Sequence, residues 1–321
     1  MPHSLLGFEW RKSPAHYLLL TKFLYPQDAD RLARSEEWKG VLGEDPRRAI
    51  ERFMKEGLVE LVELPEMIDR QYTVSDLKKM LQQRSLATTG RKSELISRLI
   101  EADPEGMKRA VAGIMLIKCS PQGRQVAEEY LQREQAKRAQ LEKEVILDLK
   151  RRKFRDAVLK IASYEAAQVF PRGMGVDWKH YDPSNDVEIL TAIFQVKPRR
   201  LSLLTDALLE NVRIAAGMHT LMWNLGQATE WLEANQPAEL GVPCRVAILD
   251  LVSYARFKVE IAHLRRLGYK WVRINTCNDN HVCEACRKLS SKRYPIDKVP
   301  DLPYERCTSE ACRCFIVGSL E

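Results

Sequence analysis

Apolar residues recur along most of this chain at the three-to-four-residue spacing of amphipathic helices. From Pro121 to Phe170 the pattern continues without an internal proline, and an apolar stripe extends it between Asp186 and Asn235. Asp45-Pro46 and Ser120-Pro121 each place a capping side chain before a proline, which is typical of a helix start. We therefore expect a mainly α-helical, multi-domain protein.

Three short segments instead have the composition of strands. Residues 58–64 alternate in part between apolar and acidic side chains, and Pro65 is expected to end that strand. The other two are residues 114–118 and 270–275. The first two segments could pair, which would leave everything between them as an inserted module. That arrangement of helix, two strands and helix is reminiscent of a small winged-helix-like unit.

Prolines and glycines divide the chain into its expected parts, with breaks near residues 171–175 and 236–243. These parts are an N-terminal helical, winged-helix-like part at 1–68, a helix-loop-helix module at 69–108, a basic long helical segment at 109–170, a helical domain at 171–240 and a small cysteine-rich domain at 241–321.

Length and charge narrow the class of protein. With 321 residues the chain is longer than single cores usually support, which agrees with several domains. No apolar run is long enough to cross a bilayer, and the first ten residues lack the pattern of a secretory signal. We expect a cytoplasmic protein with no membrane partner. The formal net charge of +7 is compatible with a polyanionic partner but does not require one.

Residues 72–101 predict two short helices joined by a loop. Thr73 can cap the first helix, and Gly90 precedes the second. A helix N-terminus offers free backbone N–H groups to phosphate oxygens, so cations and a hydroxyl beside it favour contact with DNA. The residues expected to make that contact are Lys78, Lys79, Thr89, Gly90, Arg91, Lys92, Ser93 and Arg98. A helical hairpin used only for protein contacts is the alternative.

This segment resembles the SAP family. The positions that agree in order and spacing are Leu77, Lys78, Leu81, Leu86, Gly90, Lys92, Glu94, Leu95, Ile96, Arg98 and Leu99. SAP modules are small helical units known for binding DNA, often A·T-rich duplex, without catalysis. The resemblance covers residues 72–107 and implies double-stranded DNA as the partner and a role that is not enzymatic.

A dense basic run, Lys150-Arg151-Arg152-Lys153, lies within the long helical segment. Such a run is usually the solvated face of a helix. Its alternative role is phosphate contact, which requires several cations on one surface. We include all four residues among the candidate DNA contacts.

Five cysteines near the C-terminus form a pattern expected of a metal site. Cys283 and Cys286 stand in a Cys-x-x-Cys pair, and Cys307, Cys312 and Cys314 follow after a loop. Two such groups suit a tetrahedral Zn²⁺ with four thiolate ligands and no position left for water, which would make the ion structural. If the last pair is extended, its thiols point to opposite faces. We therefore expect Cys312 as the fourth ligand, with Cys314 as its alternate.

Other residues of the cluster leave the ligand set open. Cys277 and His281 are further candidates, and disulfides or free thiols are the alternatives to a metal. Cys119 and Cys244 lie outside the cluster and are expected to be buried. The small domain has few apolar residues for a core of its own. The main candidates are Trp271, Ile274, Leu289, Tyr294, Ile296 and Phe315.

From Ala255 to Cys314 the chain resembles the C-terminal domain of phage Mu F-like head morphogenesis proteins. The matching residues are Trp271, Val272, Asp279, Val282, Cys283, Cys286, Lys292, Tyr294, Pro303, Cys312, Arg313 and Cys314. Two departures stand out: Ser291 replaces a glycine, and residues 304–311 replace a His-Pro, where Cys307 can take the place of the histidine. The resemblance implies a structural role in head assembly as an alternative function.

A zinc-knuckle nuclease fits the sequence poorly. HNH nucleases also use paired Cys-x-x-Cys knuckles, but they need a general-base histidine and further His or Asn ligands, and His281 is the one histidine of this cluster. No phosphate-cradling glycine loop or nucleophile elbow occurs. We expect a non-catalytic DNA-binding accessory protein, with a protein partner on the helical middle or the C-terminal domain.

Overall fold

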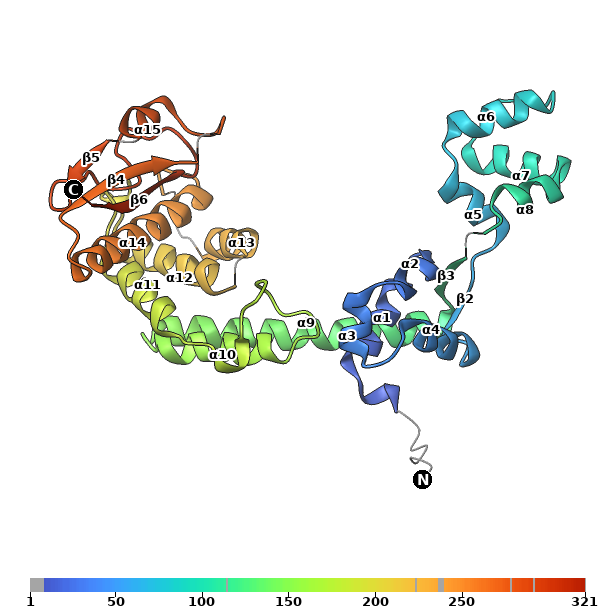
Figure 1. The fold of residues 1–321 in the computed structure, drawn as a ribbon, viewed down its shortest axis with the longest axis horizontal. Helices are drawn as coiled ribbons and strands as arrows, with labels where there is room; N and C mark the ends of the chain where they lie inside the picture. Colours follow the sequence, from blue (N-terminus) through green and yellow to red (C-terminus); the bar gives the residue numbers. More distant parts are fainter. Residues whose placement is uncertain are drawn as a thin grey trace. The chain divides into compact units, whose positions relative to one another are not determined.

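The computed structural model describes residues 9–113, 115–222, 224–235, 240–277, 279–290 and 292–320. Ile114, residues 236–239 and Ser291, on which parts of the sequence predictions fall, lie outside them. The described chain is mainly helical with a few short strands, as predicted. It divides into two compact units, Met1–Lys137 and Arg138–Glu321, whose boundary lies within helix α9 (Figure 1).

The first unit is built around the predicted pair of strands. Its elements before the insertion are α1 (Pro14–Lys22), β1 (Gln27–Asp28), α2 (Ala29–Ala33), α3 (Glu36–Leu42), α4 (Pro46–Lys55) and β2 (Val59–Leu61). Strand β3 (Leu116–Cys119) lies between β1 and β2 and is antiparallel to both, with Val59 opposite Cys119. The pairing is confirmed, but β2 is shorter than predicted because helix α5 already begins at Leu64, with Pro65 in its first turn.

Capping side chains begin the helices on either side of this sheet. The Asp45 carboxylate accepts the N–H of Arg47 at 2.9 Å at the start of α4. Helix α9 (Pro121–Lys150) begins where the Ser120 hydroxyl accepts the N–H of Gly123 at 3.1 Å. Both helix starts agree with the sequence. None of the described helices, α9 included, is long and apolar enough to cross a membrane.

The segment between β2 and β3 folds into four helices with a core of their own. They are α5 (Leu64–Gln71), α6 (Val74–Gln83), α7 (Lys92–Ala102) and α8 (Pro104–Ala110). The buried side chains of this core are Ile68, Leu77, Leu81, Leu95, Ile96, Leu99, Met107 and Val111. The inserted module is therefore stabilised by its own apolar contacts.

The long helical segment is not continuous, contrary to the prediction. Helix α9 ends at Lys150, and α10 (Phe154–Ala166) begins after a turn in which Arg152 has a φ of 60°. The Arg152 guanidinium donates two hydrogen bonds of 2.8 Å to the Glu210 carboxylate and lies 4.3 Å from the centre of the Phe194 ring. These distant partners stabilise a backbone conformation that a solvated helix face would not require.

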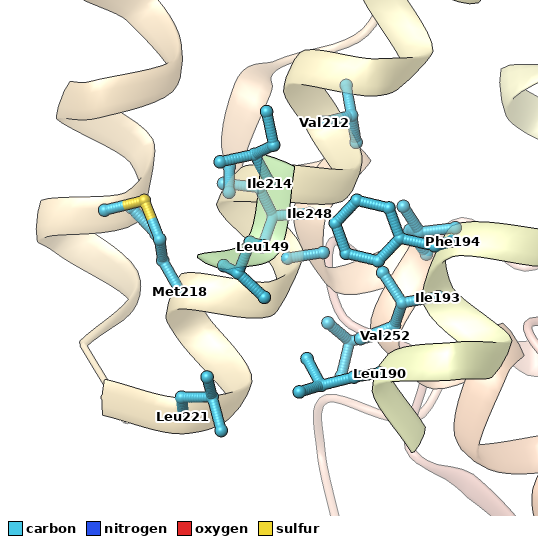
Figure 2. Close-up of a cluster of buried hydrophobic side chains, with 14 of the residues drawn as sticks. Leu149, Leu190, Ile193, Phe194, Val212, Ile214, Met218, Leu221, Ile248 and Val252 are labelled. Atoms are coloured by element: carbon cyan, nitrogen blue, oxygen red, sulfur yellow. The ribbon is translucent and has the colours of Figure 1, made fainter. Parts of the chain in front are cut away.

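A helical core organises the second unit. Beyond α10 it contains α11 (Ser184–Gln195), α12 (Asp206–Met222), α13 (Leu225–Asn235) and α14 (Cys244–Arg266). Figure 2 shows the centre of this core, where Leu149 at the end of α9 packs with side chains of α11, α12 and α14. Those labelled are Leu190, Ile193, Phe194, Val212, Ile214, Met218, Leu221, Ile248 and Val252.

A three-stranded antiparallel sheet packs on the second half of α14 (Figure 1). Its order is β5 (Arg293–Pro295), β4 (Trp271–Thr276) and β6 (Cys314–Ser319), and a short helix, α15 (Glu284–Leu289), lies between β4 and β5 in sequence. Helix α14 supplies Phe257, Ile261 and Leu264 to the core beneath the sheet. The expectation that Phe315 and Trp271 belong to this core is wrong, because Phe315 is 46% exposed and the half-buried Trp271 does not pack against the core beneath the sheet.

Gly123 gives a direct test of how α9 is placed against β2. A Cβ added there would lie 1.7 Å from the carbonyl oxygen of Leu58, which is backbone and cannot move aside. We expect Gly123→Ala to lower the free energy of unfolding by roughly 1–3 kcal/mol or more, the cost of overpacking. The measurement is urea unfolding followed by circular dichroism.

Gly40 in α3 is the matched control, because no atom lies within 4 Å of the added Cβ. Gly40→Ala should raise the free energy of unfolding by roughly 0.5–1 kcal/mol, since alanine loses less backbone entropy in a helix. Equal effects of the two substitutions would contradict the packing of α9 on β2.

Candidate nucleic-acid interface and metal centre

Helix α6 begins with a reciprocal cap. The Thr73 hydroxyl accepts the N–H of Asp76, and the Asp76 carboxylate accepts the N–H of Thr73 at 3.0 Å. Hydrogen bonds from the Thr73 hydroxyl and backbone keep the pKa of Asp76 below its usual value. The predicted cap at Thr73 is confirmed, and it satisfies backbone N–H groups at the start of α6.

Helix α7 begins differently, because Arg91 stands at its N-cap position. Arginine has no acceptor atom, so the side chain there cannot accept the first N–H groups of the helix. Glu94 accepts the N–H of Arg91 at 3.1 Å. Within the described module, the N–H groups of Lys92 and Ser93 remain open toward solvent at the positive end of the helix.

Gly90 is required by the geometry of this helix start. Its φ is +125°, a region that residues with a Cβ rarely adopt, and an added Cβ would lie 2.4 Å from the Glu94 carboxylate. Glycine also leaves the backbone accessible beside the open N–H groups. The predicted loop therefore presents backbone, not bulky side chains, at the start of α7.

Two predicted contact residues have structural partners. The Arg98 guanidinium donates to the carbonyl groups of Ala87 and Thr89, the latter at 3.1 Å, and so fixes the loop before α7. Lys92 forms an ion pair of 3.2 Å with Asp69 of α5 and also donates to the Asp69 carbonyl. The remaining candidates of the module are exposed. They are Lys78, Lys79, Thr89, Gly90, Arg91 and Ser93.

The second group of candidate contacts lies in the other unit of the chain. Lys150, Arg151 and Lys153 are exposed at and after the end of α9. Arg152 instead binds Glu210 and the Phe194 ring, as described above. Three of the four cations of the basic run thus remain open to solvent.

Five thiols gather at the C-terminus in two overlapping groups. The sulfur atoms of Cys283, Cys286 and Cys307 lie within 4.8 Å of one another, and so do those of Cys286, Cys312 and Cys314. The Sγ atoms of Cys283 and Cys307 are 3.8 Å apart. These five cysteines could hold a metal ion, and the described cysteines are all free thiols.

The local backbone explains why the thiols meet. Cys283 is the N-cap of α15, so Cys286 lies in the first turn of that helix. Strand β6 begins at Cys314, which leaves Cys312 outside the strand. The prediction that Cys312 and Cys314 point to opposite faces is therefore wrong, because their sulfur atoms lie in one group with Cys286.

Backbone N–H groups point at three of the sulfur atoms. Cys283 accepts from Thr308 and Cys286, Cys307 accepts from Ser309, and Cys312 accepts from Cys314. Such bonds stabilise a thiolate, as at the turns of structural zinc sites. None of these donors is visible as a pattern in the sequence, because each depends on a local turn.

Burial and neighbouring groups shift the pKa values of the clustered thiols in different directions. Burial raises the pKa of Cys283, but the N–H donors of Thr308 and Cys286 outweigh it and lower the value to about 6. Burial raises the pKa of Cys286, and the neighbouring Cys312 together with burial raises that of Cys307. A bound divalent cation would stabilise the thiolate form of the cysteines that ligate it.

Cys312 and Cys314 are both candidates for a fourth ligand, because the sulfur atom of each lies within 4.8 Å of that of Cys286. The Cys312 side chain interacts with Cys307 and lies within reach of Cys286, whereas Cys314 groups only with Cys286 and Cys312. Cys277 and His281 are exposed and lie outside both groups of the described residues. Cys119, expected to be buried, donates its thiol to Leu20, and burial raises its pKa to about 11. Cys244, which was also expected to be buried, is half-buried.

The inserted module is a four-helix unit with its own core and an open start of α7. Comparison with known protein families finds the SAP domain at residues 70–104. This match confirms the SAP resemblance at these residues and suggests a role in DNA binding. Neither the curated proteins nor the solved structures contain a match to the chain. The resemblance of Ala255–Cys314 to head morphogenesis proteins stays a prediction.

The thiol geometry predicts different effects of single cysteine substitutions on metal content. Cys283→Ser and Cys307→Ser should each remove most of the bound zinc, because each thiol has backbone donors that fit a thiolate ligand. Cys314→Ser should leave the content near that of the unsubstituted protein. The measurement is elemental analysis of protein purified without chelator, together with titration of free thiols.

Cys277→Ser is the control for loss of a thiol outside the cluster. A zinc content near zero in the unsubstituted protein, with all thiols titratable, would exclude the metal site. Loss of zinc in Cys314→Ser but not in Cys312→Ser would exclude the proposed fourth ligand.

Proposed function

We propose that this protein is a cytoplasmic, non-catalytic accessory protein that binds double-stranded DNA through its SAP module. The observation that carries the proposal is the start of α7, where Gly90 and Arg91 leave the first N–H groups of the helix open. Because the positive end of a helix attracts anions, these groups suit a phosphate oxygen of the DNA backbone.

The exposed side chains around this point fit the same ligand. Thr89 and Ser93 offer hydroxyl groups, and Arg91 offers a guanidinium that can bind a phosphate with two hydrogen bonds. Lys78 and Lys79 add charge from α6. Contacts with phosphate fix a protein on DNA but carry little sequence information. We therefore propose backbone binding without a strict sequence preference.

Lys150, Arg151 and Lys153 are proposed as additional phosphate contacts, because they are exposed cations in one short turn. Arg152 takes a structural part in this proposal. Its guanidinium already binds Glu210. Separating Arg152 from Glu210 would leave two unpaired charges beside the helical core of the second unit.

Zinc is proposed as a structural ion held by Cys283, Cys286, Cys307 and Cys312. Four thiolates fill a tetrahedral coordination shell, so no position is left for a water molecule to act in hydrolysis. Free thiols clustered in this way require a reducing compartment, which supports the cytoplasm. The same closed shell supports a role without catalysis. A protein partner would bind the helical middle or the C-terminal domain.

A structural role in phage head assembly is the second candidate function. Its support is the order of elements after Ala255, where α14, β4, the Cys-x-x-Cys pair and Cys312–Cys314 follow one another as the resemblance implies. Portal and capsid genes beside this gene would favour head assembly. A neighbourhood without them would count against it.

The SAP proposal predicts how paired substitutions change DNA binding. Arg91→Ala with Lys92→Ala should weaken binding to all duplex sequences about equally and reduce the slope of log affinity against log salt by about 1–2 units, because fewer counterions are released. Of the two single substitutions, Arg91→Ala should weaken binding more than Lys92→Ala, since the Lys92 side chain is already paired with Asp69. The measurement is fluorescence anisotropy with short duplexes at several salt concentrations.

Lys108→Ala with Arg109→Ala is the matched control. It removes the same charge from the same module, but from exposed positions in α8. If both double variants lose affinity equally, the binding reflects net charge and not the start of α7. An unchanged affinity and salt slope in the Arg91 and Lys92 variant would exclude the proposed interface.

A further inference from the structure

The sheet β5-β4-β6 has one face that no helix of its core covers. Val272, Ile274 and Ile316 point toward α14, so their neighbours along the strands point the other way. We call this second side the open sheet face. Its residues are Trp271, Arg273 and Asn275 of β4, Arg293 and Pro295 of β5, and Phe315, Val317 and Ser319 of β6.

The chemistry of the open sheet face is unusual for a solvated surface. None of its residues is acidic, and Phe315 and Val317 are 46% and 36% exposed. Arg273 lies directly opposite Arg293 in the pairing of β4 with β5. Like charges opposite each other destabilise a sheet. Among the described residues, neither arginine has an ion-pair partner, so this cost is not relieved within the chain.

Aromatic side chains flank these two arginines. The Arg293 guanidinium lies 4.6 Å from the centre of the Trp271 ring. Phe315 is opposite Asn275, four residues beyond Trp271 along β4. At about 3.3 Å per residue the two ring-bearing positions are about 13 Å apart, with Arg273 between them. A hollow of about 460 Å³ adjoins Trp271 and is lined by Leu267, Tyr269, Lys270, Ser319 and Leu320.

We propose that the open sheet face binds single-stranded nucleic acid, with bases stacked on Trp271 and Phe315 and phosphates held by Arg273 and Arg293. Phe315 is exposed and Trp271 is partly exposed beneath the Arg293 guanidinium, which would have to move toward a phosphate for a base to stack on the indole. Such rings can stack on bases only where the bases are unpaired, because a duplex keeps them inside its own stack. The absence of acidic residues on the face and its two unpaired arginines match a polyanion. This site is separate from the SAP module and does not depend on the duplex binding proposed there.

Binding of a short, labelled oligo(dT) to the full-length protein tests this site by fluorescence anisotropy. Trp271→Ala with Phe315→Ser should raise the dissociation constant for oligo(dT) roughly five- to a hundred-fold, the range for loss of stacked bases. Affinity for duplex DNA should stay unchanged. Oligo(U) measured in parallel distinguishes DNA from RNA as the strand that the face prefers, and weakening with either strand supports the proposal.

Arg273→Gln with Arg293→Gln is the second variant, and it should reduce both the affinity for oligo(dT) and the salt dependence. Its control is Arg265→Gln with Lys298→Gln, which removes the same charge from exposed positions in α14 and in the turn after β5. Arg91→Ala with Lys92→Ala should lose duplex binding and retain oligo(dT) binding, which separates this proposal from the SAP interface.

Three results would overturn the proposal. The first is an unchanged dissociation constant for oligo(dT) in both face variants, with melting temperature and zinc content as in the unsubstituted protein. The second is an equal loss in the Arg265 and Lys298 control, which would indicate net charge alone. The third is a dimer in light scattering that becomes a monomer in the Trp271 and Phe315 variant, because the face would then bind a second copy of this chain.

Discussion

The antiparallel pairing of β2 with β3 is the constraint on which the first unit depends. It places Leu61 opposite Ile117, so the chain leaves and re-enters the small sheet at one point. Everything between these residues must fold with its ends together, which explains why the inserted helices have a separate core. The pairing also sets the start of α9, where Gly123 allows close contact with the Leu58 carbonyl. The SAP module is thus a folded unit carried on a strand pair.

In the second unit, the sheet and the loops that carry the cysteines have little apolar surface of their own and depend on α14 for a core. Helix α14 contributes its first half to the helical core and its second half to the core beneath the sheet. One face of the sheet is stabilised in this way and the other remains available for binding. Beside it, five thiols lie in two overlapping groups that could hold a cation.

Local patterns in the sequence predicted the features that local interactions determine. The caps at Asp45, Thr73 and Ser120 and the core positions of the SAP helices need only neighbouring residues, and the structure confirms them. The features that the sequence did not predict depend on contacts between residues far apart in the chain. The break at Arg152 depends on Glu210 and Phe194, which no helical pattern reveals. The common grouping of Cys312 and Cys314 and the outward position of Phe315 depend on where β6 begins and pairs.

The proposed function depends on contact between the first turn of α7 and the DNA backbone. Hydrogen exchange of the full-length protein, with and without a short duplex, tests it most directly because every backbone N–H group reports separately on its own contacts. We expect the duplex to slow exchange in the loop before α7 and in its first turn, residues 86–95, while α8 changes little. Unchanged exchange in that segment, at a duplex concentration where binding is complete, would contradict the account.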